Sequence, residues 1–200
     1  MTFYGQTTNR GVRQMTTATA SLTGHYTVDA AHSSINFGIR HVMVAKVRGS
    51  FKDFAGTGFL DIETPSNSTL ELTIQATSID TGNNDRDAHL RSNDFFSMEE
   101  FPTMTFVSKE FAAAGGNTYK VTGDLTIKGI SKSVTIDLDF TGDAVDPYGN
   151  NRIGFEGSSS IDRTDFGVNF NAALETGGVM LGEKISLEFD ISAIRNAEVA

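Results

Sequence analysis

The sequence predicts an all-β protein, an antiparallel β-barrel of about eight strands with short helical insertions. Apolar and polar residues alternate along most of the chain, as they do in strands that bury one face. The strands are long, short turns join them, and no βαβ pattern occurs, which argues against a parallel sheet. A sandwich of this length would show shorter strands, so we expect a barrel.

Composition limits the classes of function. The formal net charge of -9, from 16 Lys and Arg against 25 Asp and Glu, argues against nucleic acid and against anionic membrane surfaces as partners. The chain has no cysteine, so disulfides, thiolate nucleophiles and Cys-ligated metals are excluded. No apolar run approaches the length of a membrane span or of a signal peptide. We therefore expect no transmembrane segment and a cytoplasmic protein.

The length of 200 residues is that of one domain with a tail. Residues 1–22 lack strand alternation, and we expect them to form a flexible N-terminal tail. Residues 23–196 are expected to form the barrel domain.

The first half of the domain alternates strongly. Ile35, Phe37 and Ile39 face one way, a single long strand is expected over Val47 to Asp61, and residues 69–76 alternate strictly. The next stretch, Ser78 to Phe96, is rich in charge and does not alternate. Asp and Asn capping candidates at residues 83–85 predict a short helix there, from about Asp85 to Arg91.

The second half returns to strands. A tight reversal at Lys128-Gly129 joins two alternating runs into a hairpin, and Asp146-Pro-Tyr-Gly149 has the residues of a β-turn. Strands are expected over Arg152 to Asp162 and Gly182 to Arg195. Between them, Arg163 to Gly167 forms a second irregular insertion.

Fifteen phenylalanines and no tryptophan form the strongest compositional signal. If these rings point inward, the interior is wholly apolar, and it is either packed solid or open as a tunnel. A barrel of about eight strands lies at the size where both are found.

Three charged side chains from the two insertions are candidates for a polar head group: Arg86, His89 and Arg163. An arginine fork matches an anionic oxygen cluster. The alternative is that these residues form helix caps and ion pairs on a solvated face. The four histidines have no zinc-ligand spacing, and we expect no metal site and no cofactor.

A set of motifs spread over residues 24–195 closely resembles the YceI-like family of polyisoprenoid-binding proteins. The motifs are Tyr26-x-Val28-Asp29-x-x-His32-Ser33, Val47-x-Gly49-x-Phe51, Ser78-Ile-Asp-Thr81, Arg86-Asp87-x-His89-Leu90, Phe95-Phe96, Phe101-Pro102, Gly123-Asp-Leu-Thr-Ile-Lys-Gly129, Asp146-Pro-x-Gly149 and Arg163-x-Asp165-Phe-Gly167. The resemblance implies a lipocalin-like antiparallel barrel whose apolar tunnel holds a long isoprenoid or a similar amphipathic chain. It implies no catalytic residue.

The leading hypothesis is a non-enzymatic protein that binds a polyisoprenoid or related lipid, an isoprenoid quinone or a polyprenyl phosphate, for transport, storage or sequestration. Strand facing predicts the tunnel walls to be Phe37, Ile39, Phe54, Leu72, Phe106, Leu125, Phe155 and Ile161. Two alternatives stay open. One is an enzyme acting on a lipid or quinone with a His/Asp acid-base pair, and the other is a stress-related interaction protein without a ligand. A homodimer is expected, because soluble oligomers are most often two-fold.

Overall fold

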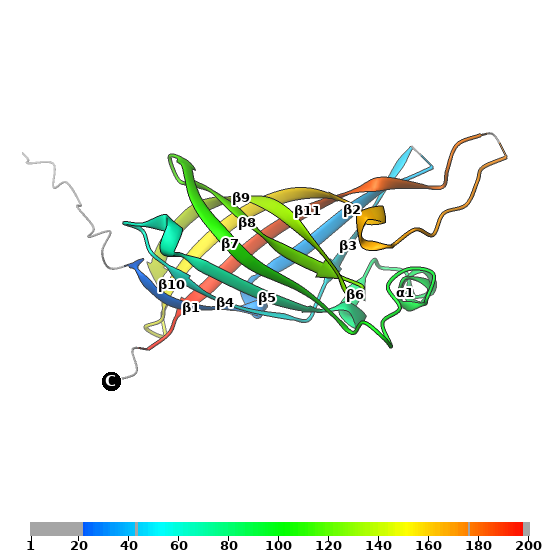
Figure 1. The fold of residues 1–200 in the computed structure, drawn as a ribbon. Coiled ribbons are helices and arrows are strands. Elements are labelled where there is room, and N and C mark those ends of the chain that lie inside the picture. Colours follow the sequence, from blue (N-terminus) through cyan, green and yellow to red (C-terminus); the bar gives the residue numbers. More distant parts are fainter. Residues whose placement is uncertain (1–21, 43, 176, 198–200) are drawn as a thin grey trace, which may run out of the picture.

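The computed structural model describes residues 22–42, 44–175 and 177–197. The tail expected over residues 1–22 lies outside these residues, except for Leu22, whose carbonyl accepts a 2.7 Å hydrogen bond from the Tyr26 hydroxyl. The described chain forms one antiparallel sheet that closes into a barrel (Figure 1). Its strands are β1 (Gly24–Val28), β2 (Ser34–His41), β3 (Ala45–Phe51), β4 (Phe54–Leu60), β5 (Thr69–Gln75), β6 (Ile79–Asp80), β7 (Thr103–Gly115), β8 (Thr118–Ile127), β9 (Ile130–Val145), β10 (Asn151–Asp162) and β11 (Leu181–Arg195).

Eight strands form the closed ring, in the order β1-β4-β5-β7-β8-β9-β10-β11, and β1 pairs back onto β11. The long strand β11 has two neighbours on that side. Its first part pairs with β2 and its end pairs with β1, so β1 and β2 follow each other along β11 with a short 3-10 turn between them. The predicted antiparallel barrel of about eight strands is confirmed.

One predicted strand is divided. The run from Val47 to Asp61 forms β3 and β4, which separate at Lys52 and Asp53. At this point the Lys52 amide donates to the Ser78 carbonyl, and the Asp53 carbonyl accepts from the Gln75 amide. On one side of this break β3 pairs with the short strand β6, and on the other side β4 pairs with β5.

The predicted helix is α1 (Asn84–Arg91), and it lies at one end of the barrel, next to β6 (Figure 1). The Asn83 side chain caps it by accepting from the Arg86 amide, as expected for an Asn at this position. Polar contacts hold the helix in place. The buried Asp87 carboxylate accepts from the Thr81 amide and hydroxyl, and Arg91 donates to two carbonyls before the helix. No helix of the described residues is both long and apolar enough to span a membrane.

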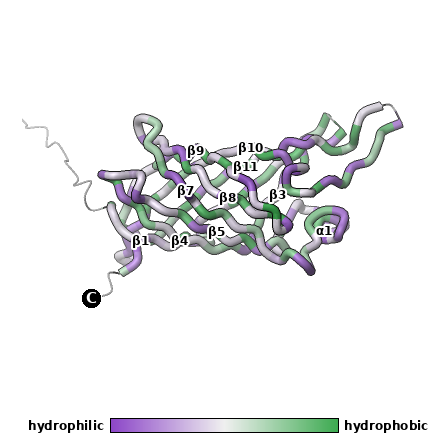
Figure 2. Tube along the Cα trace, in the orientation of Figure 1, coloured by the Kyte–Doolittle hydropathy of each residue, from purple (hydrophilic) through white to green (hydrophobic). Residues whose placement is uncertain are grey.

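The alternation of hydrophobic and hydrophilic residues runs along the barrel strands (Figure 2). The inward-facing residues make three apolar clusters. One lies at the α1 end around Ile79 and Phe166, one in the middle around Val121, and one at the β1 end around Tyr26. The interior is therefore apolar from one end of the barrel to the other.

Candidate functional site

An apolar cavity of about 240 Å³ lies inside the barrel, lined by side chains from every strand of the ring. Both Ile153 and Ile161 of β10 line it, so it extends roughly 26 Å along that strand at the usual rise per residue. Its volume lies just below the roughly 300–1,000 Å³ of ordinary small-molecule pockets. A long cavity of so small a volume is narrow, and it suits a single extended chain better than a bulky ring system.

Residues from both faces of β4 and β5 line the cavity. Successive side chains of a strand point to opposite faces, yet consecutive residues 57–59 of β4 and 69–70 of β5 all line the cavity. Thr57 and Thr69 are exposed to solvent. We infer that the cavity opens here, towards the β1 end of the barrel, since Leu60 at the end of β4 pairs with Gly24.

The α1 end is covered by apolar side chains from two segments. Leu90, Phe95 and Phe96 come from α1 and the turn after it, and Phe166 and Val168 follow β10. The two segments meet where the rings of Phe95 and Phe170 approach with centroids 4.9 Å apart. The insertions that break the strand pattern in the sequence thus close one end of the cavity.

Seven of the eight predicted tunnel walls line this cavity: Phe37, Ile39, Leu72, Phe106, Leu125, Phe155 and Ile161. Phe54 is buried but is not among the lining residues. The prediction left out a row from β11, namely Ile185, Leu187, Phe189 and Ile191. These four residues alternate in the sequence as regularly as the others, so the same signal would have found them. Contact of any of these residues with a ligand stays a prediction.

The three predicted head-group residues are placed differently. Arg163 lines the cavity. Arg86 does not, and it donates to the hydroxyl and the carbonyl of Thr81 at 2.7 and 2.8 Å. His89 is also outside the lining, where it bonds the Asp94 carboxylate at 2.8 Å and packs edge-on against the rings of Phe95 and Phe170.

Arg163 is 5% exposed and begins the 3-10 turn after β10 (Arg163–Phe166). Its Nε donates to the Gly182 carbonyl at 2.9 Å, and its Nη1 donates to the carbonyls of Val168 and Phe170. Burial lowers the pKa of the guanidinium, but an arginine stays protonated in proteins. The structure therefore keeps a positive charge against the apolar cavity.

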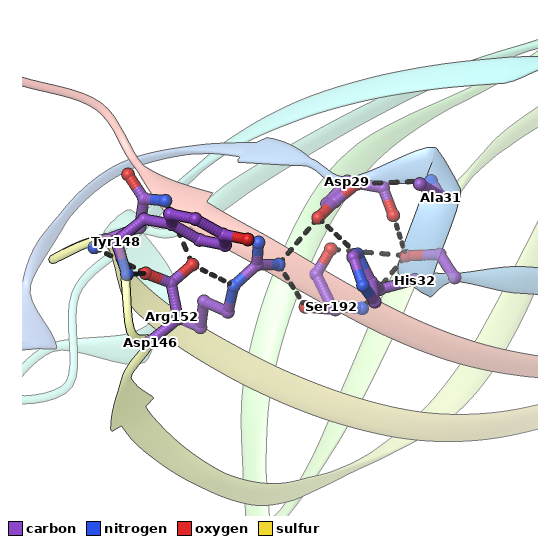
Figure 3. Close-up of polar contacts among 9 residues, drawn as sticks. Asp29, Ala31, His32, Asp146, Tyr148, Arg152 and Ser192 are labelled. Carbon is purple, nitrogen blue, oxygen red and sulfur yellow. Dashed lines mark hydrogen bonds and ion pairs between the residues drawn. The ribbon is translucent and has the colours of Figure 1, made fainter.

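A second arginine, Arg152, lies in a polar network on the outer face of the barrel (Figure 3). It lies between two carboxylates, and donates to Asp29 at 2.6 Å and to Asp146 at 2.8 Å. His32 bonds the same Asp29 carboxylate at 2.8 Å. The hydrogen bond from Arg152, followed by that from His32, lowers the pKa of Asp29, while the Asn150 amide and then Arg152 lower the pKa of Asp146.

This network connects the turn between β1 and β2 with β10, β11 and the turn before β10. Arg152 also donates to the Ser192 hydroxyl of β11, at 3.2 Å. None of its residues lines the cavity. It holds strands together at the place where β11 changes partners from β2 to β1.

A His/Asp acid-base pair, the enzyme alternative, would need a histidine at the cavity, but none of the four histidines lines it. His32 and His89 each pair with an aspartate, but neither lines the cavity, and neither do His25 and His41. Within the part of the chain that the structure describes, no three His, Cys, Asp or Glu side chains come together in a way that would hold a metal ion.

Comparison with known proteins identifies the family. Residues 26–193 match the model of a family described as the YceI-like domain. The chain belongs to the YceI-like family. A UPF0312 protein of Staphylococcus epidermidis is 46% identical over 164 residues, which cover 82% of this chain and 93% of that protein. A UPF0312 protein of Staphylococcus aureus is 44% identical over 173 residues, covering 84% and 98%.

Solved structures share the YceI-like barrel. BcnA of Burkholderia cenocepacia has a TM-score of 0.73 at 28% identity, over 82% of this chain and 98% of that one. A YceI protein of Campylobacter jejuni has a TM-score of 0.68 at 31% identity, over 80% and 91%. A polyisoprenoid binding domain from Saccharophagus degradans has a TM-score of 0.65 at 18% identity, over 86% and 98%, and this likeness shows the fold. The family predicted from the motifs is confirmed.

Among the residues that the structure describes, the YceI-like barrel thus offers a narrow apolar interior, an inferred opening beside β4 and β5, and the buried cation of Arg163. Such an interior can shield an apolar chain from water, and the guanidinium can donate hydrogen bonds to a polar group at the end of that chain. These two features would suit an amphipathic ligand.

Proposed function

We propose that this YceI-like protein binds one long-chain polyisoprenoid or related amphipathic lipid in its barrel, as a carrier, store or sequestering protein. The observation that carries the proposal is the apolar cavity running from Ile153 to Ile161 along β10. Membership of the YceI-like family supports it, as does the fold shared with the polyisoprenoid binding domain of S. degradans.

Burial of apolar surface alone would give a lipid a large favourable free energy of binding. Removing several hundred Å² of a polyprenyl chain from water contributes on the order of 10 kcal/mol at roughly 25 cal/mol per Å², before the costs of ordering the chain. The contacting residues proposed are the seven predicted walls that line the cavity, joined by the β11 row around Phe189, with Arg163 at the head group. His89 would affect the bound lipid indirectly, by positioning the rings of Phe95 and Phe170, against which it packs.

Native mass spectrometry of gently purified protein tests the proposal, followed by organic extraction of the bound material. We expect a one-to-one adduct whose mass matches a polyprenyl phosphate, an isoprenoid quinone or another long-chain lipid. A ligand-free mass that persists after incubation with such lipids would overturn the proposal.

A matched pair of variants ties the adduct to the cavity. Val134 of β9 lines the cavity, whereas its neighbour Thr135 is exposed on the outer face. Val134→Trp should fill the narrow cavity and abolish the adduct, and Thr135→Trp should leave it unchanged. Thermal unfolding of both variants checks that they are folded, since overfilling a core costs typically 1–3 kcal/mol.

We also propose that the protein acts in the cytoplasm as a homodimer. Light scattering measures the mass in solution and so checks the homodimer. Cell fractionation of the protein's own host checks the cytoplasmic location. A monomeric mass would overturn the homodimer, and recovery of the protein outside the cytoplasm would overturn the location.

A further inference from the structure

Arg163 is the one charged side chain among the described residues that line the cavity. The rest of the lining is apolar, apart from Tyr26, Thr57 and Thr69 near the other end. Arg163 comes just after Ile161, the last lining residue of β10, so the charge lies at the α1 end.

The hydrogen bonds of Arg163 leave one nitrogen unused. Nε and Nη1 donate to the three carbonyls of Gly182, Val168 and Phe170, and no described group accepts from Nη2. In the described chain, every side-chain nitrogen or oxygen that is sealed from solvent has a hydrogen-bond partner. Nη2 therefore keeps accessible surface, and since the residue is 95% buried and lines the cavity, we take that surface to face the cavity.

Among the described residues, no carboxylate makes an ion pair with Arg163 within 4 Å. Asp162 and Glu183 act on its charge only through space. The Asp162 carboxylate instead accepts from the amide and hydroxyl of Thr164. A buried cation without a counterion is costly even when carbonyls accept its hydrogen bonds, which favours a ligand that brings a negative charge.

We propose that the cavity selects a long-chain lipid with an anionic head group, a phosphate or a carboxylate, whose oxygens bind Nη2 of Arg163 at the α1 end. This inference rests on the proposed function and sharpens it, because it excludes neutral alcohols and quinones as preferred ligands. The tail then runs along β10 towards the opening beside β4 and β5.

Charge-assisted hydrogen bonds are the reason to expect that an anionic head group binds more tightly than a neutral one. They are roughly twice as strong as neutral ones, and the advantage grows where water is excluded. A hydrogen bond to a charged group contributes about 1.5–3 kcal/mol, so we expect at least a tenfold preference for the acidic ligand.

Two pairs of probes with matched chains test the inference by equilibrium binding, each used below its critical micelle concentration. The pairs are geranylgeranyl phosphate with geranylgeraniol, and palmitate with 1-hexadecanol. We expect the acidic member to bind at least tenfold more tightly, and the pair with the larger ratio identifies phosphate or carboxylate as the natural group. Equal affinities within both pairs would overturn the inference and leave the proposed function standing, whereas no binding of any probe would overturn both.

Variants assign the preference to Arg163. Arg163→Met should bring the two members of a pair to equal affinity while the alcohol still binds, and Arg163→Lys should keep part of the preference. Arg86→Met is the control, because Arg86 also donates to a backbone carbonyl near α1 but does not line the cavity. A folded Arg163→Met protein that retains the full preference would overturn the role of Arg163.

A measurement on the unmodified protein covers the case in which the Met variant does not fold. In protein labelled with ¹⁵N-arginine, geranylgeranyl phosphate should shift the side-chain resonance of Arg163, and geranylgeraniol should leave it in place. Equal shifts with both probes would contradict the inference.

Discussion

Two arginines on the same strand of the barrel, or directly after it, have opposite surroundings. Arg152, at the start of β10, lies on the outer face between the carboxylates of Asp29 and Asp146 (Figure 3). Arg163, one residue after the end of β10, lies at the end of the cavity and has backbone carbonyls as its partners. The first charge is paired with two carboxylates, whereas no carboxylate of the described residues pairs with the second within 4 Å.

The comparison separates an arginine held by carboxylates from one that we propose binds a ligand. In the outer network, the guanidinium of Arg152 on β10 and the carboxylates of Asp29 and Asp146 satisfy one another across the turn after β1 and the turn before β10. The inner arginine orders the chain after β10 and retains a donor for something else. The predictions below test this difference from its largest expected effect to its smallest.

The largest effect is expected from the apolar residue next to the inner arginine. Phe166→Ala should lower the free energy of unfolding by about 3–5 kcal/mol, because Phe166 is 2% exposed and its loss leaves a void at the α1 end. Tyr148→Ala, beside the outer network, should change it by less than about 0.5 kcal/mol, since Tyr148 is 90% exposed. Urea denaturation measures the free energy of unfolding of both variants. Similar losses would contradict the placement of Phe166 in the core and of Tyr148 on the surface.

A smaller but clear loss is expected for Arg163→Met, which removes donors from three carbonyls of the segment that follows β10. We expect the free energy of unfolding to fall by about 3 kcal/mol in urea denaturation. Because none of these hydrogen-bond partners titrates, and only the through-space attraction to Asp162 and Glu183 depends on pH, most of the loss should persist at pH 4. A loss that vanishes at acid pH would indicate a carboxylate partner instead.

Arg152→Met should destabilise the protein less, and its effect should depend on pH. The folded pKa values of Asp29 and Asp146 lie below their unfolded values near 3.9, so their contribution is present above that value and is lost as pH falls through the folded pKa values. Unfolding midpoints of wild type and variant should therefore differ at pH 7 and converge towards pH 2. A difference that is independent of pH would argue against the network.

The smallest effect is expected for His32→Ala. The imidazole is 67% exposed although its partner Asp29 is 14% exposed, and exposed ion pairs contribute typically 0.2–1 kcal/mol. We expect a change of less than about 0.5 kcal/mol between pH 5 and 7 by urea denaturation. A loss as large as that of Arg152→Met would show that His32, rather than Arg152, holds Asp29.

Most of the fold was predictable because each strand has one apolar face, and closing the sheet puts all those faces on the inside. The same rule predicted seven cavity-lining residues, from Phe37 to Ile161. It did not predict the break at Lys52 and Asp53, where the backbone bonds instead to Gln75 and Ser78, more than 20 positions along the chain.

The head-group candidates show where sequence reasoning ends. Arg86, His89 and Arg163 are alike in the sequence, each a charged residue in an insertion between strands. In the structure, Arg86 bonds to Thr81 and His89 bonds to Asp94, and Arg163 is the one of these three residues that lines the cavity.

The sequence by itself determined the antiparallel barrel, its apolar interior and the family, because alternation and turn residues act between near neighbours in the chain. The tertiary structure decided which charged residue meets the cavity, where the cavity opens, and which arginine has a counterion. Those outcomes depend on closure of the ring between β1 and β11, which brings residues more than 160 positions apart side by side.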